Sequence, residues 1–164
     1  MMSTINAAVL TISDKGSKGE RADSSGDHIV RTFGKAGIAV AKYEIIPDEL
    51  DTIAITLKQW ADSGGVDLII TTGGTGLAPR DVTPEATRMV IEKEVPGIVD
   101  MMRSNGFKDT PAAVLSRALA GVRGKCLIIN LPGNPRAVKE YMELILLVIP
   151  HAVDTLQGKI GDHN

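Results

Sequence analysis

Three short apolar segments, separated by two stretches with helical periodicity, limit the folds open to the first half of this chain. The segments at residues 5–12, 38–46 and 67–72 are short enough for buried strands. Strands that alternate with helices of this length pair in parallel through right-handed crossovers. The pattern therefore predicts an α/β fold built on a parallel sheet, with ligands bound beyond the carboxyl ends of its strands.

The two helical stretches have recognisable ends. In the first, Asp23 or Ser24 can cap the helix, and Gly37 supplies a left-handed stop. In the second, Asp48 can cap, and apolar residues recur at helical spacing until Gly64. Together with the three apolar segments, these helices give the order βαβαβ.

The second half of the chain contains two similar helix starts. Thr83 precedes Pro84 and Asn134 precedes Pro135, so each pair places a capping residue before a proline at the first helical position. The last of these helices should break or kink at Pro150. We expect helices at 83–92, 96–107 and 134–149, a buried strand at 125–131, and either a strand or a loop at 112–121.

Composition excludes several classes of function. Aromatic residues make up only 3% of the chain, the net charge is -2, and the sequence has no basic stripe, so we expect no nucleic-acid partner. The single cysteine, Cys126, lies in an apolar run, which indicates a buried residue rather than a metal ligand or a disulfide. The longest apolar run, 144–150, is too short to cross a bilayer. We therefore expect one domain over residues 1–164, without a membrane partner and located in the cytoplasm.

A glycine-rich turn follows the third predicted strand. Its residues are Thr71, Thr72, Gly73, Gly74, Thr75 and Gly76. Glycines can take positive φ angles and approach a ligand closely, which lets several N–H groups face one anion, such as phosphate. The turn alone is equally consistent with a tight connection that binds nothing, because neither of the two common phosphate-binding glycine motifs is present.

Charged residues close to this turn favour a phosphate site. Arg80 can pair bidentately with phosphate oxygens, and the carboxylate of Asp81 can hold Mg²⁺. Asp48 should lie at the same edge of the sheet, so two carboxylates from separate loops could face one ligand. The alternatives are a solvated arginine and two carboxylates that only cap helices or lie on the surface.

A second turn should reach the same edge of the sheet. Its candidate binding residues are Asn130, Pro132, Gly133 and Asn134. Gly133 allows close approach of a ligand, and the helix that begins at Pro135 offers a positive N-terminus. An ordinary connection between a strand and a helix is the alternative, but two such turns in one sheet favour binding.

Several motifs together carry a resemblance to a known family. TTGGTG at 71–76, RDVTPEAT at 80–87 and NLPGNP at 130–135, with ISD at 12–14 and IPDE at 46–49, resemble the molybdopterin-binding domain of molybdenum-cofactor biosynthesis proteins. The resemblance covers nearly the whole chain. It implies a three-layer α/β/α fold with a mostly parallel sheet and a small hairpin, assembled as a homotrimer or hexamer. It also implies Mg²⁺-dependent transfer of AMP from ATP to molybdopterin, with release of pyrophosphate.

The resemblance also assigns roles to individual residues. Asp48 and Asp81 match the two acidic residues that catalyse the transfer and hold Mg²⁺ in the family. The pterin and its phosphate match the two turns together with Ser116, whereas the nucleotide matches Ser13 and Asp14. The partners implied are molybdopterin, ATP and other proteins of molybdenum-cofactor biosynthesis.

The sequence is also consistent with two other functions. A non-catalytic carrier or scaffold would bind molybdopterin without transferring AMP, and the chain ends at Asn164 without the C-terminal extension of the longest relatives. A hydrolase of nucleotide-like substrates would use the same fold. An assay with ATP, Mg²⁺ and molybdopterin distinguishes these functions.

Overall fold

A six-stranded sheet organises the protein, and its strands lie in the order β2-β1-β3-β6-β5-β4. The computed structural model describes residues 4–160. The pairs β1–β2, β1–β3 and β3–β6 are parallel, whereas β5 pairs antiparallel with β6 and with β4. The strands are β1 (Asn6–Ile12), β2 (Ala39–Ile46), β3 (Leu68–Thr72), β4 (Lys93–Glu94), β5 (Ala120–Arg123) and β6 (Cys126–Leu131). The predicted mostly parallel sheet and its small hairpin, β5–β6, are confirmed.

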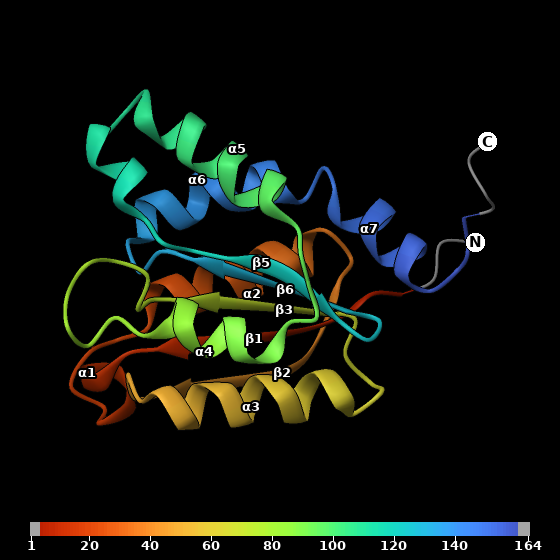
Figure 1. Cartoon of the computed structure of the whole chain (residues 1–164), viewed down its shortest axis with the longest axis horizontal. Helices are drawn as coiled ribbons and strands as arrows, with labels where there is room; N and C mark the ends of the chain where they lie inside the picture. The colour runs from red at the N-terminus through yellow and green to blue at the C-terminus, as the bar shows by residue number, and fades with distance from the viewer. Residues whose placement is uncertain (1–3, 161–164) are drawn as a thin grey trace.

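Helices cover both faces of this sheet and complete the three layers (Figure 1). They are α1 (Asp14–Ser17), α2 (Ser24–Lys35), α3 (Leu50–Asp62), α4 (Thr83–Val90), α5 (Pro96–Phe107), α6 (Pro135–Ile145) and α7 (Ile149–Leu156), with a 3-10 helix, η1 (Pro111–Leu115). No helix within residues 4–160 is long and apolar enough to cross a membrane.

Two apolar clusters, one on each face, hold the layers together. Successive residues of the central strands alternate between them: Val9 and Ile70 pack with α2, α5, α6 and α7, whereas Leu10 and Ile69 pack with α3 and α4. Because both faces of these strands are covered, their sequences are continuous apolar runs. This burial explains why the strands were visible in the sequence.

The structure confirms two predicted helix caps and corrects two others. The side chain of Asp23 caps α2 and that of Asn134 caps α6. Asp48 does not cap α3, which begins at Leu50 after Glu49, because its carboxylate accepts a hydrogen bond from another loop. Thr83 is the first residue of α4 rather than its cap, because its hydroxyl donates to the glycine turn.

Further differences lie in element boundaries. The helix expected at 134–149 ends at Ile145, and Pro150 lies in the first turn of a separate helix, α7. The helix expected to reach residue 92 ends at Val90. The ambiguous segment 112–121 contains the end of η1 and the start of β5. The short elements α1 and β4 were not predicted, since neither is long enough to show periodicity.

Candidate active site

The glycine turn after β3 lies at the carboxyl edge of the parallel strands, at the left of Figure 1. Gly73 and Gly74 have φ angles of 103° and 69°. A Cβ on Gly73 would collide with the carbonyl oxygen of Ile12, and one on Gly74 with the hydroxyl of Thr83. Thr83 fixes the turn, because its hydroxyl donates to the Gly73 carbonyl at 2.9 Å and its backbone N–H donates to the Gly74 carbonyl at 3.1 Å. Only glycine fits this backbone at either position.

Two cavities open on either side of this turn. The larger, about 670 Å³, lies between the turn, η1 and the start of α6, and the smaller, about 340 Å³, lies between the turn, the end of β1 and the start of α2. Gly74, Asp81 and Gly133 line both. The site therefore has two compartments that meet at a carboxylate.

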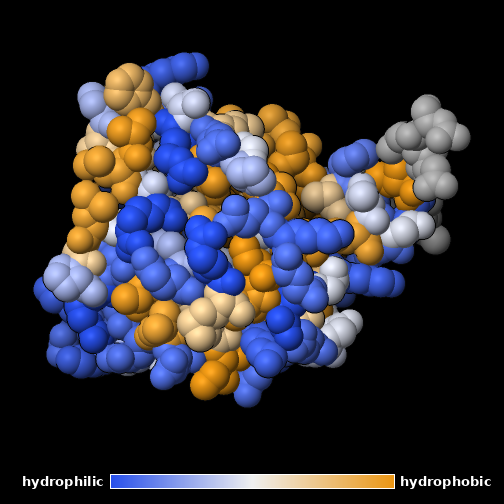
Figure 2. Space-filling model, viewed as in Figure 1, coloured by the Kyte–Doolittle hydropathy of each residue, from blue (hydrophilic) through white to orange (hydrophobic). Residues whose placement is uncertain are grey.

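The larger cavity has an apolar rim. Figure 2 shows apolar side chains gathered along the upper left edge of the molecule, over η1 and the end of α5. Leu77 and Leu115, two large exposed hydrophobic residues, line this cavity. Phe107 and Val114, which are also exposed, line a neighbouring pocket on α5. A rim of this kind suits a ligand with an apolar or planar ring.

Asp48 and Asp81 both line the smaller cavity, although they come from different loops. The carboxylate of Asp48 accepts a hydrogen bond from the Asp14 N–H at 2.9 Å, and that of Asp81 accepts one from the Ala78 N–H at 3.0 Å. Burial raises the pKa of Asp48, and the charges of Asp14 and Asp81 raise it further. The two carboxylates therefore repel each other, and a cation between them would remove this repulsion.

Arg80 links the loops that carry these carboxylates. Its guanidinium donates two hydrogen bonds to Asp14, at 2.9 and 3.0 Å, and one to Glu49 at 2.9 Å. The hydrogen bonds from Arg80 lower the pKa of Asp14. Asp14 in turn accepts a hydrogen bond from the Asp48 N–H at 3.0 Å. The loops after β1, β2 and β3 are thus tied together around the smaller cavity.

Comparison with known proteins identifies the family. Residues 8–151 match the family model described as "Probable molybdopterin binding domain". The chain belongs to this family. A protein of Helicobacter pylori named molybdopterin adenylyltransferase is 44% identical over 159 residues, which cover 96% of this chain and 90% of that protein. The Escherichia coli K12 protein of the same name is 38% identical, covering 96% of this chain and 88% of that protein.

Solved structures show the same relationship. The molybdopterin biosynthesis enzyme MoaB of Thermus thermophilus has a TM-score of 0.88 and 49% identity, covering 94% of this chain and 98% of that one. The tungsten cofactor synthesizing protein MoaB of Pyrococcus furiosus has a TM-score of 0.85 and 35% identity, covering 94% and 98%. The family resemblance drawn from the motifs is confirmed.

Several motif residues of the molybdopterin-binding domain line the cavities. Gly133 lines both, Ser13 and Thr72 line the smaller one, and Ser116 and Asn134 line the larger. The other predicted ligands that line a cavity are Gly73, Gly74, Thr75, Gly76 and Pro132. The structure therefore brings Ser116 and parts of the ISD, TTGGTG and NLPGNP motifs together at one site, and their contact with substrate stays a prediction.

Other predicted ligands have protein partners in the structure. Asn130 is fully buried, and its amide donates to the hydroxyls of Thr71 and Thr87, at 3.0 Å each, while its oxygen accepts from the Leu119 N–H. The buried side chains of Asn130 in β6 and Thr71 in β3 therefore bond to each other and support the two turns from within the sheet. Contact of either side chain with a ligand stays a prediction. Arg80 and Asp14 are similarly engaged with each other.

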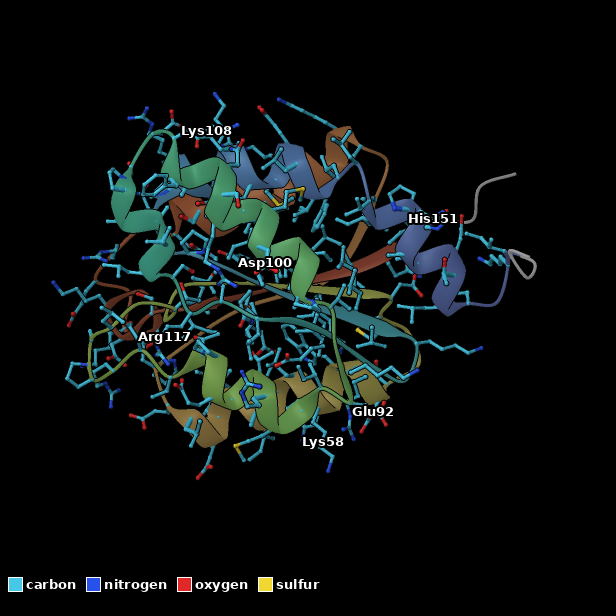
Figure 3. The ribbon with its side chains drawn as sticks, turned by 45° about the horizontal axis from the view of Figure 1, so that its top comes forward. Lys58, Glu92, Asp100, Lys108, Arg117 and His151 are labelled. Carbon is cyan, nitrogen blue, oxygen red and sulfur yellow. The ribbon has the colours of Figure 1, made fainter. Side chains whose placement is uncertain are left out.

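Three arginines near the site were missed by sequence reasoning. Arg21 lines the smaller cavity and Arg136 lines the larger. Arg117 lies near the first turn of α4, as Figure 3 shows, and pairs there with Glu85. No local pattern marks these residues, because their positions depend on tertiary structure. The one available signal was that Arg117 directly follows Ser116, which the resemblance had assigned to binding.

The raised pKa of Asp48 predicts a gain in stability when its charge is removed. Because the pKa is higher in the folded protein, the ionised carboxylate destabilises the fold at neutral pH. Asp48→Asn should therefore raise the Tm at pH 7 by about 2–4 °C. This difference should shrink as the pH falls through the raised pKa and vanish well below 3.8, the ordinary pKa of an aspartate, where the carboxyl is protonated in both states. Thermal unfolding between pH 7 and about pH 3 measures both effects, and a constant difference would contradict the prediction.

Proposed function

We propose that this protein transfers AMP from ATP to the terminal phosphate of molybdopterin and releases pyrophosphate. The observation that carries the proposal is the pair of cavities that meet at Asp81, with Asp48 in the smaller one. A transferase for two substrates needs two adjoining binding sites, and where both substrates carry phosphates it needs groups that offset their charge at the point where the sites meet. Relatives named molybdopterin adenylyltransferase, 38–44% identical to this chain, support it.

The larger cavity suits the pterin. Its apolar rim can cover a planar ring system, and Arg136 can pair with the phosphate that the pterin carries. The smaller cavity suits the phosphates of ATP, because Arg21 and the N-termini of α2 and α6 border it. Ser13 and the glycine turn complete its wall.

The reaction requires little acid-base chemistry from the protein. The second pKa of a phosphate monoester is about 6, so the nucleophilic oxygen of molybdopterin is largely ionised at neutral pH. This oxygen forms a bond with the α-phosphorus of ATP, and the bond from that phosphorus to the bridging oxygen breaks as pyrophosphate leaves with the electron pair. The residues of the site align the two phosphates for this in-line displacement and hold water away.

The site also fits Mg²⁺. Among residues 4–160, no group of three or more His, Cys, Asp or Glu side chains is arranged so that it could hold a metal ion by itself. Mg²⁺ usually takes only one or two carboxylates and completes its coordination with substrate phosphates and water. Asp48 and Asp81 provide such a pair, and Gly74 and Gly76 leave free space beside their carboxylates. When bound there, the ion would supply positive charge that offsets the charge of the ATP phosphates.

An assay with α-labelled ATP, Mg²⁺ and molybdopterin tests the proposal. We expect labelled adenylyl-molybdopterin and one pyrophosphate for each molecule of product. Binding of molybdopterin without labelled product would identify a carrier or scaffold instead. Pyrophosphate released without molybdopterin would identify a hydrolase. A homotrimeric or hexameric assembly stays a prediction from the resemblance, and a cytoplasmic location stays a prediction from the sequence.

A further inference from the structure

The loop that carries Asp81 needs support from outside itself. It connects the glycine turn to α4 and contains the exposed Leu77. Its internal hydrogen bonds are local: the Asp81 N–H donates to the Ala78 carbonyl at 2.9 Å, and the Ala78 N–H donates to the Asp81 carboxylate at 3.0 Å. These bonds shape the end of the loop, and Arg80 ties it to the loops after β1 and β2, but neither joins it to the segment before β5 that lines the larger cavity.

Arg117 supplies that support. Its Nε donates to the Gly76 carbonyl at 2.8 Å, and its Nη2 donates to the Asp81 carbonyl at 2.7 Å. Its backbone N–H donates to the Thr75 carbonyl at 2.9 Å. The remaining Nη1 pairs with Glu85 in the first turn of α4. The Arg117 side chain therefore forms hydrogen bonds at both ends of the loop and also pairs with the helix that follows, α4.

We propose that Arg117 is the positioning residue that holds Asp81 at the junction of the two cavities. This inference rests on the proposed function and extends it to a residue outside the site itself. The planar guanidinium presents Nε and Nη2 in a fixed geometry that matches two carbonyls, which the single ammonium of a lysine cannot reproduce. The preceding residue, Ser116, lines the larger cavity. Arg117 thus fixes the wall of the larger cavity relative to the carboxylate at which the two cavities meet.

A matched pair of variants tests this role. Arg117→Gln removes the bridge, whereas Arg123→Gln removes a comparable arginine that pairs with Asp62 and donates to the Val90 carbonyl at 3.0 Å, at the opposite end of the sheet. We expect Arg117→Gln to lower kcat about 100-fold, because small misplacements of a reacting group have effects of this size. The KM for molybdopterin should change less than about 3-fold, and the Mg²⁺ concentration for half-maximal rate should rise about 10-fold. Arg123→Gln should stay within about 2-fold of wild type in all three.

Backbone amide hydrogen exchange supplies a readout that does not depend on activity. Amides of residues 76–83 should exchange faster in Arg117→Gln than in wild type and stay unchanged in Arg123→Gln. Arg117→Lys keeps the charge and should recover kcat to about 10-fold below wild type, because one ammonium does not reproduce both carbonyl contacts.

The results that would overturn the inference are distinct from failure of the proposed function. Wild-type kcat and exchange in Arg117→Gln, full activity in Arg117→Lys, or equal loss of kcat in the two glutamine variants would each overturn it. If wild-type protein forms no adenylylated product, the proposed function fails, and the exchange comparison still tests whether Arg117 holds the loop.

Discussion

The Asp81→Asn variant is expected to lose AMP transfer by about 1,000-fold while it binds molybdopterin about as tightly as wild type. Asp81 lies where the two cavities meet, so we expect its charge to act on the reacting phosphates rather than on the pterin ring. Asparagine keeps an oxygen that can accept the hydrogen bond from the Ala78 N–H. The loop should therefore keep its shape, and the loss should appear in kcat rather than in pterin affinity.

A control separates this effect from a general change in charge. Asp51 is an exposed carboxylate in the first turn of α3, and Asp51→Asn should leave transfer within about 2-fold of wild type. Product formation from labelled ATP and direct binding of molybdopterin are measured for both variants. Undiminished transfer by Asp81→Asn would exclude the proposed role of this carboxylate.

The sequence indicated the sheet because burial leaves a local trace. β1, β3 and β6 are covered on both faces, so each is a continuous apolar run that stands out from its surroundings. Asp23 and Asn134 could also be predicted as caps, since each side chain accepts a hydrogen bond from a residue two or three positions ahead. Features that depend on neighbours in the chain are the ones that sequence reasoning recovers.

The sequence predicted that Asp48 and Asp81 lie at one edge of the sheet, but it did not predict individual side-chain pairings between residues far apart in the chain. Asp48 stands in the sequence where a helix cap is expected, but its carboxylate accepts a hydrogen bond from the N–H of Asp14, 34 residues away. The pairing of Arg80 with Asp14, 66 residues away, was also not predicted, whereas its contact with a phosphate stays a prediction. Arg117 reaches the Gly76 and Asp81 carbonyls, 41 and 36 residues away. These pairings form only when the parallel strands bring their loops to one edge.

Gly73→Ala is expected to destabilise the protein by about 3 kcal/mol and to abolish transfer. Gly73 has a φ angle of 103°, and a Cβ there would collide with the Ile12 carbonyl. Its N–H donates to the Leu131 carbonyl at 3.1 Å, and its own carbonyl accepts from the Thr83 hydroxyl. Any shift that relieves the collision therefore disturbs β6 and the start of α4 together. For a chain of this size the Tm should fall by about 6–12 °C.

The matched control is another glycine with a different environment. Gly34 lies within α2, and among the described residues no atom outside its own helix lies within 4 Å of the position that a Cβ would take. Gly34→Ala should therefore raise stability by about 0.5–1 kcal/mol, because alanine favours the helix, and leave transfer unchanged. Thermal unfolding and the AMP-transfer assay are compared for the two variants. If Gly73→Ala melted within about 2 °C of wild type and kept its activity, the turn would tolerate a side chain and could not be the rigid junction between the cavities. Loss of activity with an unchanged Tm would instead assign Gly73 to close approach of the substrate, because the backbone would then have accommodated the alanine.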